Sequence, residues 1–153
     1  MADHGYERLG FLDSSFLIAE SPTNHMHIAG TATYEAGSLR TPDGGIDVAR
    51  IRSYVASRLH LIPRYRQVLS STPIDGHPVW IDDAHFNINY HVRHTALPRP
   101  GDENQLKVLS SRIMSQQLDR SKPLWEMWIV EGLDGGDRFA LISKTHHCMI
   151  DGI

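Results

Sequence analysis

The nine residues at 144–152, Lys-Thr-His-His-Cys-Met-Ile-Asp-Gly, constrain the fold of this chain more than any other stretch. Residues 138–143 precede them as Arg-Phe-Ala-Leu-Ile-Ser, a run typical of a buried strand. The Asp-Gly pair at 151–152 is a turn signal. The sequence therefore predicts a strand that ends at a histidine pair, His146 and His147, with a turn just beyond it.

A histidine at a strand end suits general acid–base chemistry. An imidazole titrates near neutral pH, so it can take a proton from a hydroxyl group and later return it. Adjacent strand residues face opposite ways, so only one of His146 and His147 can point into a given cavity. Asp151 can fold back through the turn to accept hydrogen bonds or pair with an arginine, which would brace the loop. Gly152 permits a backbone shape or a close approach that a side chain would block.

The pattern His-His-x-x-x-Asp-Gly at 146–152 resembles the signature of acyltransferases with the chloramphenicol-acetyltransferase-like fold. These include nonribosomal-peptide condensation domains and bacterial wax ester synthase/diacylglycerol acyltransferases. Two further blocks are similar to the wax ester synthase branch. One is Leu-Asp-Arg-Ser-Lys-Pro-Leu-Trp-Glu at 118–126. The other is the opening, Leu-Asp-Ser-Ser-Phe-Leu at 12–17 and Pro-Thr-Asn-His-Met-His at 22–27. The resemblance runs nearly the whole chain, and the three blocks in this order indicate that branch.

The resemblance implies roles for residues of the histidine motif. His147 matches the catalytic base of the family, and His146 is the motif histidine before it. Asp151 matches an aspartate whose part is mainly structural, and Gly152 the glycine beside it. We expect these residues to form the catalytic loop.

The resemblance also implies roles for residues outside the histidine motif. Pro123, Leu124 and Trp125 are expected to shape the loop near the site, although a tryptophan there is more often a core residue than a substrate contact. The opening of the chain lies near the active site in the family, so Asp13 is a further candidate site residue.

The implied reaction is O-acyl transfer from acyl-coenzyme A to diacylglycerol or a long-chain alcohol, forming triacylglycerol or wax ester. His147 would remove the acceptor's hydroxyl proton as the oxygen attacks the thioester, and would then protonate the departing thiolate. Acyl-coenzyme A is a substrate, and we expect no cofactor and no metal. Two alternatives stay open: a condensation-type acyltransferase that uses carrier-bound substrates, and a non-catalytic lipid-binding or dimerising module.

Two other chemistries are conceivable from the residues alone. Cys148 could act as a nucleophile, but its neighbour His147 is expected on the opposite face, and the family does not use this cysteine. His25 and His27 share one face of an expected strand and could ligate zinc, but a zinc site needs a third ligand.

The length and the net charge of the chain limit the classes of protein to which it can belong. With 153 residues the chain is long enough for one domain with a core, and its formal net charge of -3 implies no nucleic-acid partner. No apolar run approaches the roughly 20 residues of a membrane span. The polar N-terminus and single cysteine favour a cytoplasmic location. Given the substrates, we also expect peripheral contact with a membrane or lipid-droplet surface.

Family members have two similar halves with the active site between them. We therefore expect residues 1–153 to be an N-terminal acyltransferase half-domain that ends just after the histidine motif, with the C-terminal half absent. That half is then an expected partner. We expect the half-domain alone to be inactive, because half of the channel would be missing.

The hydrophobic pattern predicts an α+β fold, a two-layer sandwich of helices on a mixed, mostly antiparallel sheet. The expected elements are a strand at 25–34, a helix capped by Asp47, a half-buried strand at 86–92, a helix capped by Asp102, and a hairpin of strands at 125–133 and 138–145. Residues 7–20 are expected to form a packed loop with a short helical turn that begins at Asp13 or Ser14.

Overall fold

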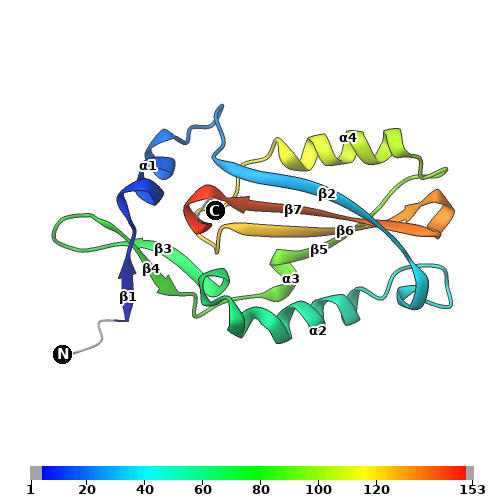
Figure 1. Ribbon diagram of the computed structural model, residues 1–153, viewed down its shortest axis with the longest axis horizontal. Coiled ribbons are helices and arrows are strands. Elements are labelled where there is room, and N and C mark those ends of the chain that lie inside the picture. Colours follow the sequence, from blue (N-terminus) through cyan, green and yellow to red (C-terminus); the bar gives the residue numbers. More distant parts are fainter. Residues whose placement is uncertain (1–4, 151–153) are drawn as a thin grey trace.

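The computed structural model describes residues 5–150 of the chain (Figure 1). In this part the strands are β1 (Tyr6–Arg8), β2 (His27–Glu35), β3 (Gln67–Ser71), β4 (Pro78–Asp82), β5 (Val92–Ala96), β6 (Trp125–Leu133) and β7 (Arg138–His146). The α-helices are α1 (Phe11–Ala19), α2 (Val48–Arg58), α3 (Ile88–His91) and α4 (Glu103–Met114). Short 3-10 turns are η1 (Gly37–Leu39), η2 (Leu59–Leu61), η3 (Pro63–Arg66), η4 (Asp134–Gly136) and η5 (His147–Met149).

The larger sheet has the strand order β2-β7-β6-β5. β7 pairs antiparallel with both β2 and β6, whereas β5 pairs parallel with β6. The predicted hairpin is therefore confirmed as β6 and β7, and the sheet is mixed as predicted. The register places His146 opposite His27, and Thr145 opposite Trp125. β7 thus delivers the histidine pair between two strands that carry other blocks of the resemblance.

Helices cover both faces of this sheet, with α2 on one side and α4 on the other (Figure 1). On the α2 face, residues of the helix pack with a core that includes Trp125, Ile129 and Phe139. On the α4 face, Leu106 and Ile113 pack with a second core, which contains Val130, Ala140 and Ile142. Adjacent residues such as Ile129 and Val130 belong to different cores because successive strand residues face opposite ways. The α+β class is confirmed, and coverage of both faces goes beyond the layering predicted from the sequence.

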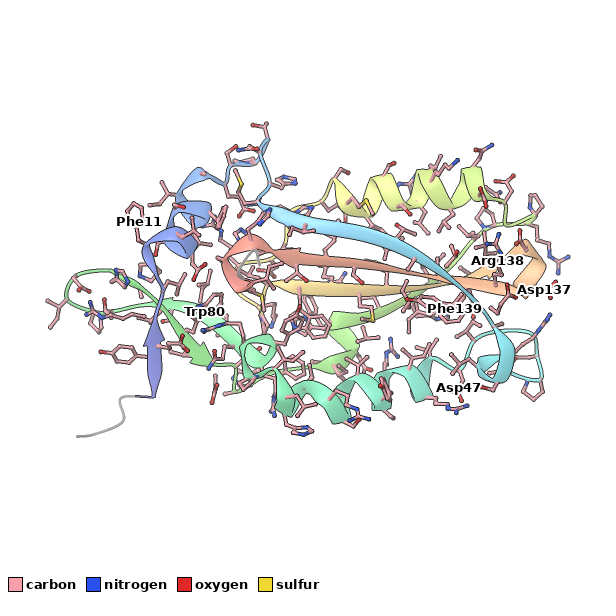
Figure 2. The ribbon with its side chains drawn as sticks, viewed as in Figure 1. Phe11, Asp47, Trp80, Asp137, Arg138 and Phe139 are labelled. Atoms are coloured by element: carbon pink, nitrogen blue, oxygen red, sulfur yellow. The ribbon has the colours of Figure 1, made fainter. Side chains whose placement is uncertain are left out.

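Two helix starts follow the predicted caps. The side chain of Asp47 accepts a hydrogen bond from Arg50 N at 3.0 Å, at the start of α2 (Figure 2). Asp102 accepts from Gln105 N at 2.8 Å, and the Gln105 side chain accepts from Asp102 N at 2.9 Å. These bonds satisfy backbone donors that a helix leaves unpaired at its first turn, so both predictions are confirmed.

The prediction of a strand over residues 86–92 was wrong. Ile88–His91 is the helical turn α3, and strand β5 begins only at Val92. The side chain of Asn87 accepts a hydrogen bond from Asn89 N at 2.9 Å, which turns the backbone away from strand pairing. Apolar and polar residues alternate through this segment of the sequence, and that alternation produced the error; in the structure His91, at a polar position of the pattern, is buried as well.

The prediction of a packed loop over residues 7–20 was also wrong, because this segment contains β1 and the nine-residue helix α1. α1 begins at Phe11 after Gly10, which offers no side-chain cap, so the expected starts at Asp13 and Ser14 lie inside the helix. β1 belongs to a smaller sheet with the order β1-β4-β3. Phe11 lies on the outer side of α1 and is 93% exposed (Figure 2).

Candidate active site

The three sequence blocks of the resemblance meet at the end of β7. The backbone N–H of His146 donates to the carbonyl oxygen of Leu124 at 3.0 Å, which ties the motif to the Pro-Leu-Trp block. The N–H of His147 donates to the carbonyl oxygen of Met26 at 2.9 Å, which ties it to the opening block. The ring of Phe16 in α1 stacks on the His147 ring, with centroids 4.9 Å apart and planes 22° apart.

His146 points inward and is completely buried. Its Nδ1 accepts a hydrogen bond from Cys148 N at 3.1 Å, so the side chain caps η5. Its Nε2 lies 3.3 Å from Oε2 of Glu20. Burial lowers the pKa of His146, which favours the neutral ring near neutral pH. This arrangement suits a residue that holds the turn in place.

His147 is the first residue of η5 and remains half-buried, so its imidazole is the more accessible of the pair. Its backbone is fixed by the bond to Met26, and its ring rests against Phe16. A general base must be held in position and yet reach a substrate hydroxyl group. Of the two histidines, His147 has the geometry for that role.

Cys148 does not have the environment of a nucleophile. The side chain is buried, and burial raises the pKa of the Cys148 thiol to about 12. The reactive species of a cysteine is its thiolate, which this environment disfavours. The nucleophile alternative is therefore not supported by the surroundings of Cys148.

The Pro-Leu-Trp block is part of the core beneath the histidine pair. Pro123, Leu124 and Trp125 are all buried. The indole Nε1 of Trp125 donates to the carbonyl oxygen of Tyr65 at 2.8 Å. The ring of His91 stacks on the indole with centroids 4.6 Å apart, and its Nδ1 donates to Trp125 O at 2.7 Å. The block therefore supports the start of β6 and, through Leu124, the end of β7.

Of the remaining predicted site residues, the structure describes only Asp13. Asp13 is in the first turn of α1, the helix that carries Phe16, and its charge contributes to raising the pKa of Cys148. Asp151 and Gly152 lie outside the described residues. Glu20 was not predicted as a site residue, although its ion-pair partner, Arg120, belongs to the block at 118–126.

His25 and His27 are held by backbone carbonyl groups. His25 Nε2 donates to Pro22 O at 3.0 Å, and His27 Nε2 donates to Met114 O at 2.8 Å. Their ring centroids lie 5.7 Å apart. Within residues 5–150, no group of three His, Cys, Asp or Glu side chains could hold a metal ion.

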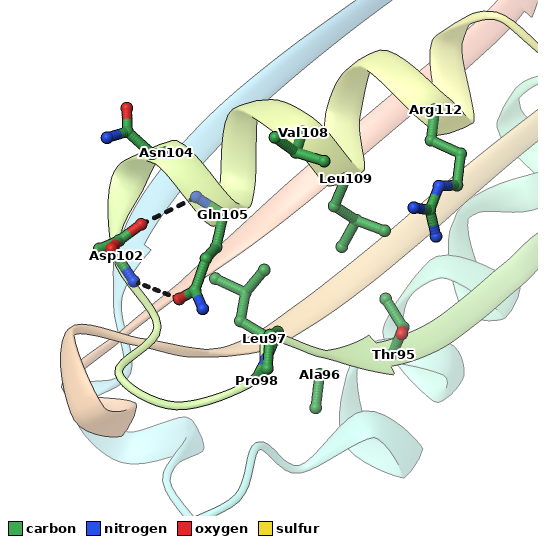
Figure 3. A pocket seen from close by; sticks show the side chains of 10 residues that line it. All are labelled: Thr95, Ala96, Leu97, Pro98, Asp102, Asn104, Gln105, Val108, Leu109 and Arg112. Carbon is green, nitrogen blue, oxygen red and sulfur yellow. Dashed lines mark hydrogen bonds between the residues drawn. The ribbon is translucent and has the colours of Figure 1, made fainter.

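Two cavities differ in their relation to the histidine pair. An apolar cavity of about 240 Å³ opens on the α2 face and reaches Ser143 and Thr145, just before the pair. Its lining includes Tyr54, Val55, Leu59, Ile62, Tyr65, Trp125 and Met127. A larger cavity of about 480 Å³ lies between β5 and α4, with Leu97 and Leu109 inside it and Arg112 at one end (Figure 3). Its strand residues pair with the far half of β6, so it is not on a path to His147.

Comparison with known proteins agrees with this geometry. Residues 9–153 match the wax ester synthase/diacylglycerol acyltransferase catalytic domain. A protein of Mycobacterium tuberculosis named a probable diacylglycerol O-acyltransferase is 41% identical over 147 residues, which cover 95% of this chain and 52% of that protein. A second protein of that name from the same organism is 42% identical over 144 residues, covering 93% of this chain and 30% of its own length.

Solved structures show the same fold. The wax ester synthase/diacylglycerol acyltransferase of Marinobacter aquaeolei superposes with a TM-score of 0.80 at 32% identity, covering 95% of this chain and 35% of that one. The starter condensation domain of rhizomide synthetase superposes with a TM-score of 0.67 at 15% identity, covering 96% of this chain and 35% of that one. The second likeness places the chain in the fold class shared by condensation domains and wax ester synthases.

Within that class, the chain belongs to the wax ester synthase/diacylglycerol acyltransferase family. It spans about half the length of the first curated relatives that it matches. In the described part, no helix is long and apolar enough to cross a membrane.

Proposed function

We propose that the protein containing this chain transfers a fatty acyl group from acyl-coenzyme A to the hydroxyl group of diacylglycerol or a long-chain alcohol. The observation that carries the proposal is the position of His147. Its half-buried imidazole stands where all three blocks meet, held by the backbone of Met26 and the ring of Phe16. The named relatives are acyltransferases of this kind.

In the proposed mechanism His147 acts as the general base. It removes the proton from the acceptor hydroxyl group while the oxygen attacks the thioester carbonyl carbon. The tetrahedral intermediate then collapses, the carbon–sulfur bond breaks, and His147 gives the proton to the thiolate of coenzyme A. An ester and free coenzyme A result, and the reaction needs no cofactor. No covalent acyl-enzyme forms, which agrees with the burial of Cys148.

The proposed substrates agree with the apolar cavity beside the site. The cavity of about 240 Å³ reaches Thr145, two residues before His147, and its walls are mostly apolar side chains. An alkyl chain is stabilised there because its burial removes apolar surface from water. We assign the cavity to the chain of a lipid substrate, whose reacting group would lie toward His147.

The other motif residues support the base in this proposal. His146 caps the turn that presents His147. Asp151 and Gly152 are the motif residues that follow in the sequence, and we assign them a supporting role. Asp13 lies in the helix that packs on that turn, at a distance from which its charge acts on Cys148. Pro123, Leu124 and Trp125 fix the strand start beneath the pair.

We further propose that a C-terminal half of the same enzyme completes the substrate channel, because the named relatives are about two to three times as long as this chain. The protein is proposed to act in the cytoplasm at the surface of a membrane or lipid droplet. The exposed apolar side chains of Phe11 and Ile18 on α1, near the candidate site, agree with contact to a lipid phase or to that other half.

The test is an acyl-transfer assay on the full enzyme with palmitoyl-coenzyme A and either hexadecanol or a diacylglycerol, following free thiol. His147→Ala should lower the turnover by roughly 10²- to 10⁴-fold, the usual contribution of a general base. His60→Ala is the matched control, because His60 is exposed in η2 and belongs to none of the three blocks of the resemblance. Full turnover in His147→Ala would refute the mechanism. Wild-type activity only with carrier-bound substrates would favour a condensation reaction.

A further inference from the structure

Glu20 has a buried carboxylate that accepts hydrogen bonds from three residues. It follows α1, and its side chain is only 1% exposed. Oε1 accepts from Gln117 Nε2 at 2.9 Å and from Arg120 Nε and Nη2 at 3.0 and 2.9 Å. Oε2 accepts from Met26 N at 3.2 Å. It also lies 3.3 Å from His146 Nε2, a charge contact whose angle is outside that of a hydrogen bond. One carboxylate thus connects α1, the opening block, the Pro-Leu-Trp block and the histidine motif.

The charge of Glu20 is balanced by Arg120. The guanidinium group contacts the carboxylate through two nitrogens and also donates to Leu17 O at 2.8 Å. Burial alone would raise the pKa of Glu20, but the hydrogen bonds from Gln117, Met26 N–H and Arg120 outweigh burial and keep that pKa below its ordinary value. Glu20 is therefore an anion, which can only accept hydrogen bonds.

The contacts of His146 identify its tautomer. Cys148 N–H is a donor, so the ring nitrogen that accepts from it, Nδ1, carries no proton. A neutral imidazole then has its proton on Nε2, the nitrogen that faces the anionic Oε2 of Glu20. The opposite tautomer would place a donor against a donor at Cys148 and a lone pair against a carboxylate at Glu20.

We propose that Glu20, held by Arg120, is a positioning residue that keeps His146 in the Nε2–H tautomer and thereby fixes the turn that presents His147. His146 Nδ1 is the side-chain acceptor at the start of η5, so its tautomer decides whether Cys148 N–H is bonded. The consequence for turnover rests on the proposed function of His147, whereas the tautomer and the turn do not.

The charged and titratable groups around His146 come from several elements. Glu20 faces it from the end of α1, Arg120 from the loop after α4, His147 from η5, and His27 from the paired position on β2. Lys144, two residues earlier on β7, is bonded to the carbonyl groups of Ile113 and Gln116. Removing Arg120 would leave Glu20 unbalanced and favour protonation of His146.

The principal variant is Glu20→Gln in the full enzyme. An amide has one acceptor oxygen and one donor group. If its oxygen accepts from Arg120, its NH₂ group faces the N–H of Met26 and the Nε2–H of His146 as a donor. We expect a mixed or reversed tautomer of His146, faster hydrogen exchange at Cys148 N–H, and turnover lowered about 10- to 100-fold, as for other partners that orient a functional histidine. The KM for acyl-coenzyme A should change little.

Glu131→Gln is the matched control. Oε2 of Glu131 accepts from Ile46 N at 3.0 Å and lies 3.3 Å from His94 Nε2, nearly the same pair of contacts at the other end of β6. This substitution makes the same chemical change as Glu20→Gln, but at a position distant from the histidine motif. It should leave the ring signals of His146, the exchange of Cys148 N–H and the turnover unchanged.

Arg120→Ala is a second variant, which keeps both Glu20 and His146. Arg120 is 43% exposed, so its loss creates no large cavity. With Glu20 unbalanced, His146 should protonate at higher pH, and its Nδ1 would then no longer accept from Cys148. The acid limb of the pH–rate profile should therefore move to higher pH than in the wild type.

The ring nitrogens of ¹⁵N-histidine-labelled protein report the tautomer by nuclear magnetic resonance, independently of activity. An unchanged Nε2–H tautomer and unchanged Cys148 exchange in Glu20→Gln would overturn the proposal. A changed tautomer with wild-type turnover would overturn the link to His147. If the wild type transfers no acyl group to any acceptor, the proposed function fails, and the tautomer and exchange measurements still decide the role of Glu20.

Discussion

Trp125 offers a quantitative test of how the Pro-Leu-Trp block supports the site. Trp125 is 3% exposed, its Nε1 donates to Tyr65 O at 2.8 Å, and its ring contacts the rings of both His91 and Tyr65. Trp125→Phe keeps an aromatic ring but leaves the carbonyl oxygen of Tyr65 without this donor. An unsatisfied buried polar group costs about 1–3 kcal/mol. The smaller ring adds about 1 kcal/mol for the unfilled volume.

The expected loss in the free energy of unfolding is therefore about 2–4 kcal/mol. The assay is urea unfolding near neutral pH, followed by far-ultraviolet circular dichroism. Trp128→Phe is the matched control on the same strand. Its Nε1 donates to Glu126 Oε2 at 3.1 Å, but the residue is only half-buried and Arg93 also pairs with that carboxylate. We expect a loss of about 1 kcal/mol there, since water can replace part of the bond. A loss in Trp125→Phe no larger than in Trp128→Phe would refute the reasoning.

Two further predictions concern buried titratable groups. Burial lowers the pKa of His27, His91 and His146, so the unfolded chain binds more protons than the folded chain at pH values just below about 6.5. The urea midpoint should therefore fall as pH drops through that range, and less steeply in His91→Gln; a midpoint that stays flat would contradict the assignment. Separately, Cys148 should react with iodoacetamide only after unfolding, because burial raises its pKa to about 12, and Cys148→Ala should keep most of the turnover. Rapid alkylation of the folded protein would show that the thiol is accessible.

The parts of the fold that were predicted correctly have local signals. Asp47 and Asp102 precede apolar helical patterns, and a cap acts within three residues along the chain. The hairpin of β6 and β7 joins two apolar runs across a short turn rich in glycine and aspartate. Such features depend on neighbours in sequence, so a single sequence contains the information that determines them.

The wrong predictions concern segments whose local signals mislead. In residues 86–92 apolar residues alternate with polar ones in the sequence, yet a helical turn and a strand start share the segment. Alternating polarity is typical of a strand but does not require one. In α1 no capping side chain precedes Phe11, and Asp13 lies within the first turn. Packing of the helix on η5 holds α1 in place, and packing is not visible in the sequence.

In the candidate site, too, some features have local sequence signals and others depend on packing between distant segments. The histidine pair was predicted from its motif, and its position at the end of β7 follows from the apolar run before it. Glu20 and Arg120 are 100 residues apart, and their contact depends on how α1 lies over the loop that precedes β6. No periodicity or spacing within the sequence predicts that contact. A buried carboxylate with its arginine can be recognised only when both elements have been placed.

Trp125 was predicted from its sequence block, but its contacts depend on tertiary packing. It was expected near the site from its block, and its indole is held in the core by Tyr65 and His91. Its link to His146 runs through the backbone, because the preceding residue, Leu124, accepts from His146 N. Trp125→Phe should therefore reduce turnover only to the extent that the start of β6 shifts. Because Trp125 also lines the cavity assigned to a substrate chain, the KM for the substrate whose chain lies there should rise in the folded variant, measured without urea. An unchanged KM for both acyl-coenzyme A and the acceptor would mean that no substrate chain lies against the indole.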